Sequence, residues 1–179
     1  MANVLIKSTD FACFWFSGDG FLPNSALPVL VYRADAINFK NMGMVETKEQ
    51  IAKIASNNEW YLDWVASIYR RPHYHSTAHE ALIIFKGTAL LQLGGNRVGK
   101  KWEVVAGNVI FIPAGVGHQR IRSTDDFTVF GLYPVGQKWD LQWGWRKNYA
   151  SSLRRIKKVP LPKADPIFGK MSPLLNCWQ

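Results

Sequence analysis

From Trp60 onward the chain alternates short apolar segments with turn residues, and this alternation constrains the fold more than any other feature. Short runs rich in β-branched and aromatic residues are typical of strands. The candidate strands cover residues 60–69, 81–85, 89–93, 102–105, 109–112, 119–122 and 127–132. Turn signals separate them at Lys86-Gly87, Gly94-Gly95-Asn96, Ala106-Gly107-Asn108, Pro113 to Gly117 and Thr124-Asp125-Asp126. Many short strands with regular turns predict an all-β sandwich or barrel.

The segments before and after this region are expected to pack on the barrel. Residues 1–26 form an irregular, aromatic-rich lead, and residues 27–32 are a further candidate strand. A capping box at Thr47-Lys-Glu-Gln50 predicts a helix over about residues 47–57. Residues 149–158 suit a short helix with a basic, solvated face in which Leu153 and Ile156 turn inward. Four prolines punctuate the tail, which is expected to wrap over the barrel.

Length and composition favour one globular domain. The chain has 179 residues, of which 47% are hydrophobic and 20% charged. We therefore expect a single domain over residues 1–179, with a core at about 60–133, an N-terminal segment at 1–59 and a C-terminal tail at 134–179. Two free thiols, Cys13 and Cys177, are favoured over a disulfide between them.

The charge and the apolar runs limit where the protein acts and what it binds. The net charge of +9 suggests an anionic partner, either nucleic acid or an acidic small substrate. The basic stretch Arg146–Lys158 comes with no nucleic-acid-binding motif, so a solvated surface is favoured over a nucleic-acid site. The sequence contains no apolar run that would span a membrane and no signal-peptide pattern. A cytoplasmic protein with no membrane association is therefore expected.

All four histidines of the chain fall in two short blocks. The first block contains His73, His75 and His79 and continues into Glu80, while the second ends at His118. Residues two apart on a strand share a face, so His73 and His75 can point together while Tyr74 points away. The intervening Ser76-Thr-Ala78 must turn the chain before Glu80 joins the same face from a neighbouring strand. Three imidazoles and one carboxylate suit a divalent Fe, Mn, Ni or Zn ion.

These blocks resemble the two cupin motifs. The first reads His73-x-His75-x4-Glu80-x6-Gly87, and the second reads Gly-x5-Pro-x-Gly-x2-His over residues 107–118. Ser67 and Arg122 stand where the family pattern has glycine and asparagine, and neither position is a ligand. Strings in the flanks (Phe21-Leu-Pro-Asn24, residues 133–140 and residues 159–165) are similar to an uncharacterised group of single-domain bacterial cupins. The resemblance implies a jelly-roll barrel with an N-terminal helix and an irregular or helical C-terminal tail.

The resemblance also implies roles for individual residues. His73, His75, Glu80 and His118 would be the metal ligands, and Glu80 could also act in catalysis as a labile ligand or local base. His79 occupies a spacer position, so a role outside the ligand set is expected for it. Gln92 and Arg120 are polar strand residues and are candidates for substrate contact. The family is often dimeric, so a homodimer is expected.

Three function classes remain open. The resemblance to cupins favours a metal-dependent enzyme of the dioxygenase type that acts on a small organic molecule. The alternatives are a metal-dependent isomerase or decarboxylase, and a small-molecule binding module without catalysis. The ligand pattern alone leaves the substrate undefined, because one fold supports many reactions.

Overall fold

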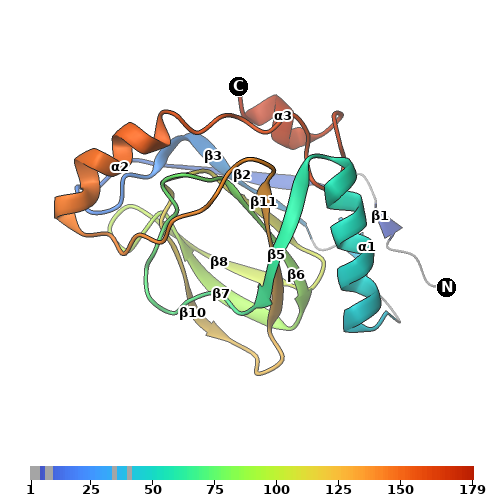
Figure 1. Ribbon diagram of the computed structural model, residues 1–179. Coiled ribbons are helices and arrows are strands. Elements are labelled where there is room, and N and C mark those ends of the chain that lie inside the picture. The colour runs from blue at the N-terminus through green and yellow to red at the C-terminus, as the bar shows by residue number, and fades with distance from the viewer. Residues whose placement is uncertain (1–4, 7–9, 34–35, 40–41) are drawn as a thin grey trace.

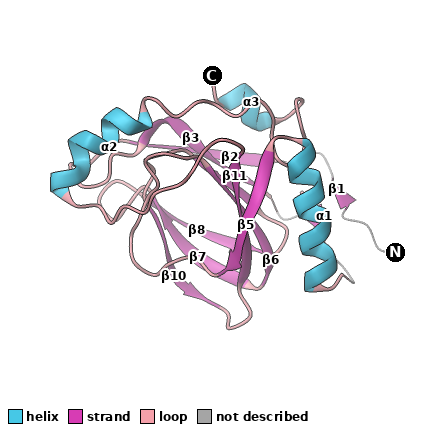
Figure 2. Cartoon of the chain, in the orientation of Figure 1, coloured by secondary structure: helices cyan, strands magenta, loops and turns pink. Residues whose placement is uncertain are grey.

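The computed structural model describes residues 5–6, 10–33, 36–39 and 42–179, and these form two main antiparallel sheets with helices at the periphery (Figures 1 and 2). The larger sheet has six strands in the order β2-β3-β9-β6-β11-β5, and the smaller has three in the order β10-β7-β8. The large sheet comprises β2 (Phe11–Phe16), β3 (Ser25–Tyr32), β5 (Trp60–Ala66), β6 (Glu80–Lys86), β9 (Val109–Ile112) and β11 (Thr128–Pro134). The small sheet comprises β7 (Thr88–Leu93), β8 (Lys100–Val105) and β10 (His118–Ser123).

The remaining elements are short, apart from one helix. A two-stranded sheet joins β1 (Leu5–Ile6) to β4 (Ile37–Asn38). The helices are α1 (Met44–Asn57), the 3-10 turn η1 (Arg146–Asn148), α2 (Tyr149–Ile156) and α3 (Pro173–Cys177). Among the described residues, no helix has both the length and the apolar character needed to cross a bilayer.

The predominantly β architecture confirms the all-β class, and its two antiparallel sheets are consistent with a jelly roll. Within the described residues the six-stranded and three-stranded sheets share no hydrogen-bonded strand, so the expected barrel is open along its seams. Side chains from both sheets fill the space between them, including Val31, Leu82, Leu91 and Ile110. This apolar layer is the inner core, and the candidate site lies at one end of it.

The outer face of the six-stranded sheet is also buried. Strand alternation turns Ile83 and Phe111 away from the inner core, and they pack with Ile51 of α1 and Leu174 of α3. In Figure 1, α1 lies beside β5 and α3 lies over the end of the sheet. The six-stranded sheet therefore carries apolar residues on both faces, which explains the nearly continuous apolar run of β6.

Two local predictions were wrong. The lead was expected to be irregular, but Phe11–Phe16 forms an edge strand paired with β3; residues 1–4 and 7–9 of the lead lie outside the described residues. The capping box was also misplaced, because α1 begins at Met44 with Gly43 as its N-cap. Thr47 is buried inside the helix, where its hydroxyl donates to the Gly43 carbonyl at 2.8 Å. The alternative side-chain bond available to threonine within a helix explains this second error.

The C-terminal tail is fixed to the sheet by specific hydrogen bonds. The Tyr32 hydroxyl donates to Asp165 at 2.7 Å, and the Trp60 indole donates to the Ala164 carbonyl at 2.8 Å. The Trp178 indole donates to the Pro28 carbonyl at 2.9 Å. At the same end of the tail, the Cys177 thiol lies 3.8 Å from the Cys13 thiol, and both are free. The tail therefore closes the outer face instead of forming a core of its own.

Candidate metal centre

The three histidines of the cupin-like blocks are brought together by backbone pairing. His73 and His118 form an isolated antiparallel bridge, in which each backbone N–H donates to the other's carbonyl at 3.1 and 2.8 Å. The Gly115 N–H donates to the His75 carbonyl at 2.7 Å, so the turn before His118 is held against the first block. Gly115 has a φ of +94°, a conformation that favours glycine.

One ring nitrogen from each of His73, His75 and His118 lies within 4.8 Å of the others, and all three residues are buried. Glu80 begins β6 and faces two of these rings. Its Oε1 lies 3.5 Å from His75 Nε2, and its Oε2 lies 3.2 Å from His118 Nε2. The structure thus gathers the three histidines into a group that could hold a metal ion and places the carboxylate beside it.

Backbone carbonyls fix the orientation of all three rings. Nδ1 of His73 lies 3.1 Å from the Arg71 carbonyl, Nδ1 of His118 lies 3.2 Å from the Val116 carbonyl, and Nδ1 of His75 lies 2.5 Å from the Asp140 carbonyl. A carbonyl only accepts, so Nδ1 carries the proton in each neutral ring and Nε2 keeps its lone pair. This tautomer is the one that metal-ligating histidines adopt.

The carboxylate of Glu80 provides a direct test of whether a cation fits. Among the described residues, no hydrogen-bond donor is directed at the buried Oε2. Its neighbour at 3.2 Å, Nε2 of His118, is an acceptor in the tautomer set by Val116. Two facing acceptors in a buried site repel each other unless a cation or a proton lies between them. The nitrogen and oxygen donors suit Fe(II), Mn(II), Ni(II) or Zn(II).

The ionisation of these groups follows from burial and from their mutual contacts. Burial, reinforced by the neighbouring His118, lowers the pKa of His73 to about 3, so this ring is neutral. Burial alone would lower the pKa of His75, but the Glu80 carboxylate outweighs it and raises that pKa. Burial alone would raise the pKa of Glu80, but the charge of a protonated His75, together with hydrogen bonds from the His118 and His75 rings when a proton lies between them and the carboxylate, holds that pKa well below its usual range. Glu80 is therefore an anion.

Tyr133 and Trp64 hold the other oxygen of this carboxylate. The Tyr133 hydroxyl donates to Glu80 Oε1 at 2.5 Å and accepts from the Trp64 indole at 3.0 Å. Burial, together with the Glu80 charge, raises the pKa of Tyr133, so its proton remains available for this bond. Gly131 leaves room for the Trp64 ring, since a Cβ there would lie 2.0 Å from it. No local pattern in the chain indicates this contact, because Tyr133 and Glu80 are far apart in the sequence.

Asp140 stabilises the loop that contacts His75. Its carboxylate accepts from the Ser76 N–H at 2.5 Å, the Ser76 hydroxyl at 2.6 Å, Thr77 at 3.1 Å and Gln142 at 2.9 Å. Burial would raise the pKa of Asp140, but the donors from Ser76 and its neighbours outweigh it and lower that pKa. This network fixes the loop whose carbonyl receives His75 Nδ1. Asp140 lies in a string noted for family resemblance, but no sequence pattern assigned it this role.

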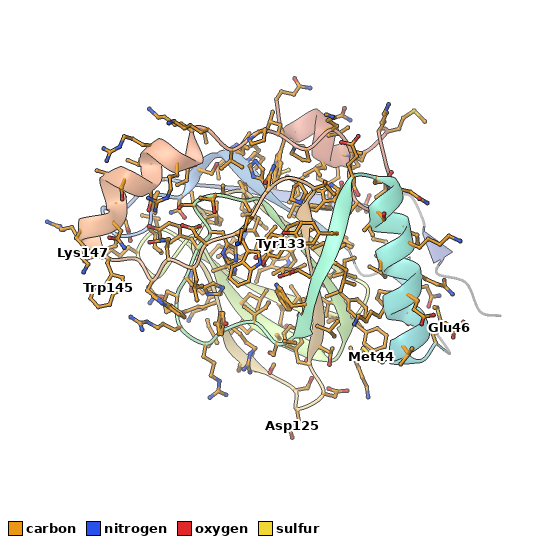
Figure 3. The ribbon with its side chains drawn as sticks, viewed as in Figure 1. Met44, Glu46, Asp125, Tyr133, Trp145 and Lys147 are labelled. Carbon is orange, nitrogen blue, oxygen red and sulfur yellow. The ribbon has the colours of Figure 1, made fainter. Side chains whose placement is uncertain are left out.

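A cavity of about 240 Å³ opens onto the histidines and Glu80. Apart from these four residues, its walls are mainly apolar and aromatic. They are formed by Trp64, Ala66, Ser67, Ile68, Tyr69, Leu82, Tyr133 and Trp139. Figure 3 shows Tyr133 in the interior of the molecule, away from the labelled surface residues. Trp139 stacks on Tyr133, with ring centroids 5.8 Å apart, and lies 5.2 Å from the His75 ring.

The other candidate residues lie away from this group. His79 Nδ1 accepts from the Ala114 N–H at 3.1 Å, and its ring lies 4.7 Å from that of Trp178. The Gln92 amide donates to the Gly95 carbonyl at 2.8 Å. The Arg120 guanidinium donates to the Ile68 carbonyl at 3.1 Å and to the Ser123 hydroxyl at 2.8 Å. None of the three is among the described residues that line the cavity, and substrate contact by Gln92 or Arg120 stays a prediction.

A small jelly-roll-like domain with three converging histidines is the arrangement of a cupin. The family model described as the cupin domain matches residues 67–130, which include all four proposed ligands. A curated relative from Bacillus subtilis (strain 168), named "Uncharacterized protein YjlB", is 37% identical over 166 residues, which cover 92% of this chain and 94% of the relative. The chain therefore belongs to the cupin family.

Solved structures match the chain at low sequence identity and with low TM-scores. Acireductone dioxygenase from Bacillus anthracis, with a cadmium ion in its active centre, matches at 17% identity and a TM-score of 0.36 over 51% of this chain and 60% of its own. Procruciferin, an 11S globulin from Brassica napus, matches at 14% identity and a TM-score of 0.35 over 64% of this chain. The present chain spans only 22% of procruciferin. One fold can support many unrelated functions, so the function of this chain has to be argued from its site.

Proposed function

We propose that the protein binds one divalent metal ion through His73, His75, His118 and Glu80 and uses it in an enzymatic reaction on a small organic molecule. The observation that carries this proposal is the common tautomer of the three buried rings. Each Nδ1 is engaged by a backbone carbonyl, so each Nε2 is left as a lone-pair donor facing the same space. The anionic Glu80 supplies the charge that balances a cation there.

The favoured reaction is an oxidation by O2, with isomerisation or decarboxylation as the alternative. A bound metal of the Fe or Mn type supplies redox chemistry, whereas Zn or Ni supplies Lewis-acid chemistry. The chain's own contribution is the surrounding cavity. Its apolar walls exclude water and strengthen electrostatic contacts. Tyr133 holds one oxygen of Glu80, which leaves the other oxygen directed at His118.

The cavity also limits the size of the substrate. A buried apolar cavity of about 150 Å³ accommodates a benzene ring, and the present one measures about 240 Å³. A ring with a short substituent, or an aliphatic molecule of similar bulk, would fill it. Glu80 begins β6 and lines the cavity, so it would accept a proton from such a substrate.

Metal content tests the site. Untagged wild-type protein should contain about one metal ion per chain by elemental analysis. The variants His75→Ala and His118→Ala should lose most of this metal. His79→Ala is the matched control, because His79 is also a buried histidine of the first block but lies outside the group. Unchanged stoichiometry in both ligand variants, or an equal loss in the control, would contradict the assignment.

Oxygen uptake tests the reaction class. Protein loaded with Fe(II) without air and then exposed to O2 should consume O2 with one member of a panel of phenols, thiols and diketones. The His118→Ala variant should not. Product formation without O2 uptake in the Zn- or Ni-loaded protein would assign the alternative class. Ligand-induced thermal stabilisation with no product from any loaded form would assign a binding module without catalysis.

A further inference from the structure

A second site lies on the surface beside the start of α2. Three aromatic and three cationic side chains line a groove of about 480 Å³, here called the cation–aromatic groove. Its side chains belong to Phe21, Arg71, Trp143, Trp145, Arg146 and Lys147. Trp145 is 50% exposed, and Figure 3 shows Trp145 and Lys147 at the edge of the molecule, near the beginning of α2. The groove joins segments that are far apart in the sequence.

The cations of the groove contact aromatic rings instead of carboxylates. The Arg71 guanidinium lies 4.7 Å from the centre of the Trp143 ring, and the Arg146 guanidinium lies 5.2 Å from that of Phe21. The Lys147 ammonium lies 5.4 Å from the Trp145 ring. Across the described part of the chain, none of these three cations forms an ion pair, whereas Arg122 pairs with a carboxylate elsewhere.

An arginine that lies over a ring is held in place but keeps its N–H groups free. The planar guanidinium presents those donors at its edge, in the spacing that phosphate and carboxylate oxygens accept. The aromatic faces hold the cations at a low cost in side-chain entropy. Arg71, Arg146 and Lys147 therefore form an ordered cluster of positive charge without a negative partner in the described structure.

One ring of the groove, Trp143, packs against two residues that line the metal cavity. The Trp143 ring lies 5.7 Å from the ring of Tyr69 and 6.1 Å from the ring of His73. Tyr69 and His73 both line the cavity. The described lining of the cavity includes no lysine or arginine, so a negative charge carried by a ligand has no counter-ion inside it. Of the groove cations, Arg71 lies over the Trp143 ring that packs against these two residues.

We propose that the cation–aromatic groove is an anion subsite for the small molecule that enters the metal cavity. The ligand would be a molecule with an apolar end that coordinates the metal and a phosphate or carboxylate at its other end. The apolar end enters the cavity, and the anion remains at the rim against Arg71 and Arg146. This inference rests on the proposed function, because it takes the cavity to be the reaction site.

The test compares phenyl phosphate, benzoate and phenol as probes. Each is titrated into the full chain, and binding is followed by NMR through the indole N–H signals of Trp143 and Trp145. Both anions should bind more tightly than phenol. Arg71→Gln and Arg146→Gln should each weaken anion binding about threefold, and the double variant about tenfold, as expected for exposed charge pairs. Phenol binding should not change.

The control is Arg154→Gln, which removes an equal charge from an exposed position of α2 outside the groove. Equal affinities for the anions and phenol, or equal losses in the control and groove variants, would overturn the proposal. A single-stranded oligothymidylate that binds through the same arginines while phenyl phosphate does not would overturn it in favour of a nucleic-acid surface. A larger effect on phenyl phosphate than on benzoate would support it and identify the anion as a phosphate.

The same titrations separate this proposal from the metal site. Metal-depleted protein should keep the preference for anions that depends on Arg71 and Arg146, since the groove contains no metal ligand. A protein that binds metal but shows no such preference would refute the groove alone. A protein that shows the preference but takes up no metal would refute the metal site alone.

Discussion

Replacement of Tyr133 by phenylalanine should weaken both the fold and the metal site. The substitution removes the hydroxyl that donates to Glu80 Oε1 at 2.5 Å and accepts from the Trp64 indole at 3.0 Å. A hydrogen bond to a charged group contributes about 1.5–3 kcal/mol. The metal-free Tyr133→Phe protein should therefore lose about 2 kcal/mol of unfolding free energy.

Metal affinity should fall as well, because the carboxylate loses the contact that orients it. Removal of a partner that orients a metal ligand typically costs about 10- to 100-fold in affinity. Urea unfolding of the metal-depleted protein measures the first effect, and competition with a chelator measures the second. Near-ultraviolet circular dichroism of the aromatic residues checks that the variant is folded.

Tyr61→Phe is the matched control for this experiment. The Tyr61 hydroxyl donates to the Gln137 carbonyl at 3.0 Å, and its ring lies 6.0 Å from that of Tyr133. Tyr61→Phe removes the same hydroxyl group from a nearby tyrosine, but the hydrogen bond that is lost is half-buried and has a neutral acceptor. The variant should therefore lose at most about 1 kcal/mol of unfolding free energy, and its metal affinity should not change. If Tyr133→Phe binds metal within about twofold of wild type, Tyr133 does not position Glu80, and the reasoning is refuted.

Three further substitutions test other contacts of the structure. Asp140→Asn replaces a carboxylate that accepts four hydrogen bonds, so the protein should lose about 2 kcal/mol in urea unfolding and bind metal more weakly. Gly131→Ala places a Cβ 2.0 Å from the Trp64 ring, so thermal unfolding should show a loss of about 1–3 kcal/mol. For His79, burial lowers the folded-state pKa to about 4, so between pH 6.5 and 4 only the unfolded chain binds its proton. His79→Gln should therefore make stability fall less steeply with acidification, by about 1.4 kcal/mol per pH unit, in urea unfolding across that range. An unchanged dependence of stability on pH in His79→Gln would contradict the burial of a neutral His79. An Asp140→Asn protein as stable as wild type would contradict the role of the Asp140 hydrogen bonds. A Gly131→Ala protein with the thermal stability of wild type would contradict the close approach of Gly131 to Trp64.

The sequence allowed prediction of those features that depend on local pattern. Alternation within strands placed His73 and His75 on one side and Tyr74 on the other, where its hydroxyl now donates to Ser152 of α2 at 2.8 Å. Turn residues marked the ends of the central strands to within a few positions. The same local signals failed at two places. Phe11–Phe16 is a strand because it pairs with β3, and α1 starts earlier than predicted because Gly43 is its N-cap.

The walls and supports of the site were beyond such prediction. Tyr133 reaches Glu80 only because β11 and β6 pair, and Asp140 reaches Ser76 only because the loop after β11 folds back over the first block. Neither contact leaves a spacing pattern in the chain. Gln92 and Arg120 were chosen as substrate contacts for their polarity on a strand. Both side chains bond to nearby backbone, and their contact with a substrate stays a prediction.

The backbone carbonyls that orient the histidines have a consequence for how this site can change under mutation. Carbonyls of Arg71, Val116 and Asp140 belong to the main chain, so no single side-chain replacement deletes the acceptor of an imidazole. Glu80 depends instead on the phenol of Tyr133, which one nucleotide change can remove. Mutational drift should therefore preserve the three nitrogen donors and act first on the carboxylate. With Glu80 as the proposed oxygen ligand, this is the position at which the scaffold would most easily acquire a different metal preference or a different reaction.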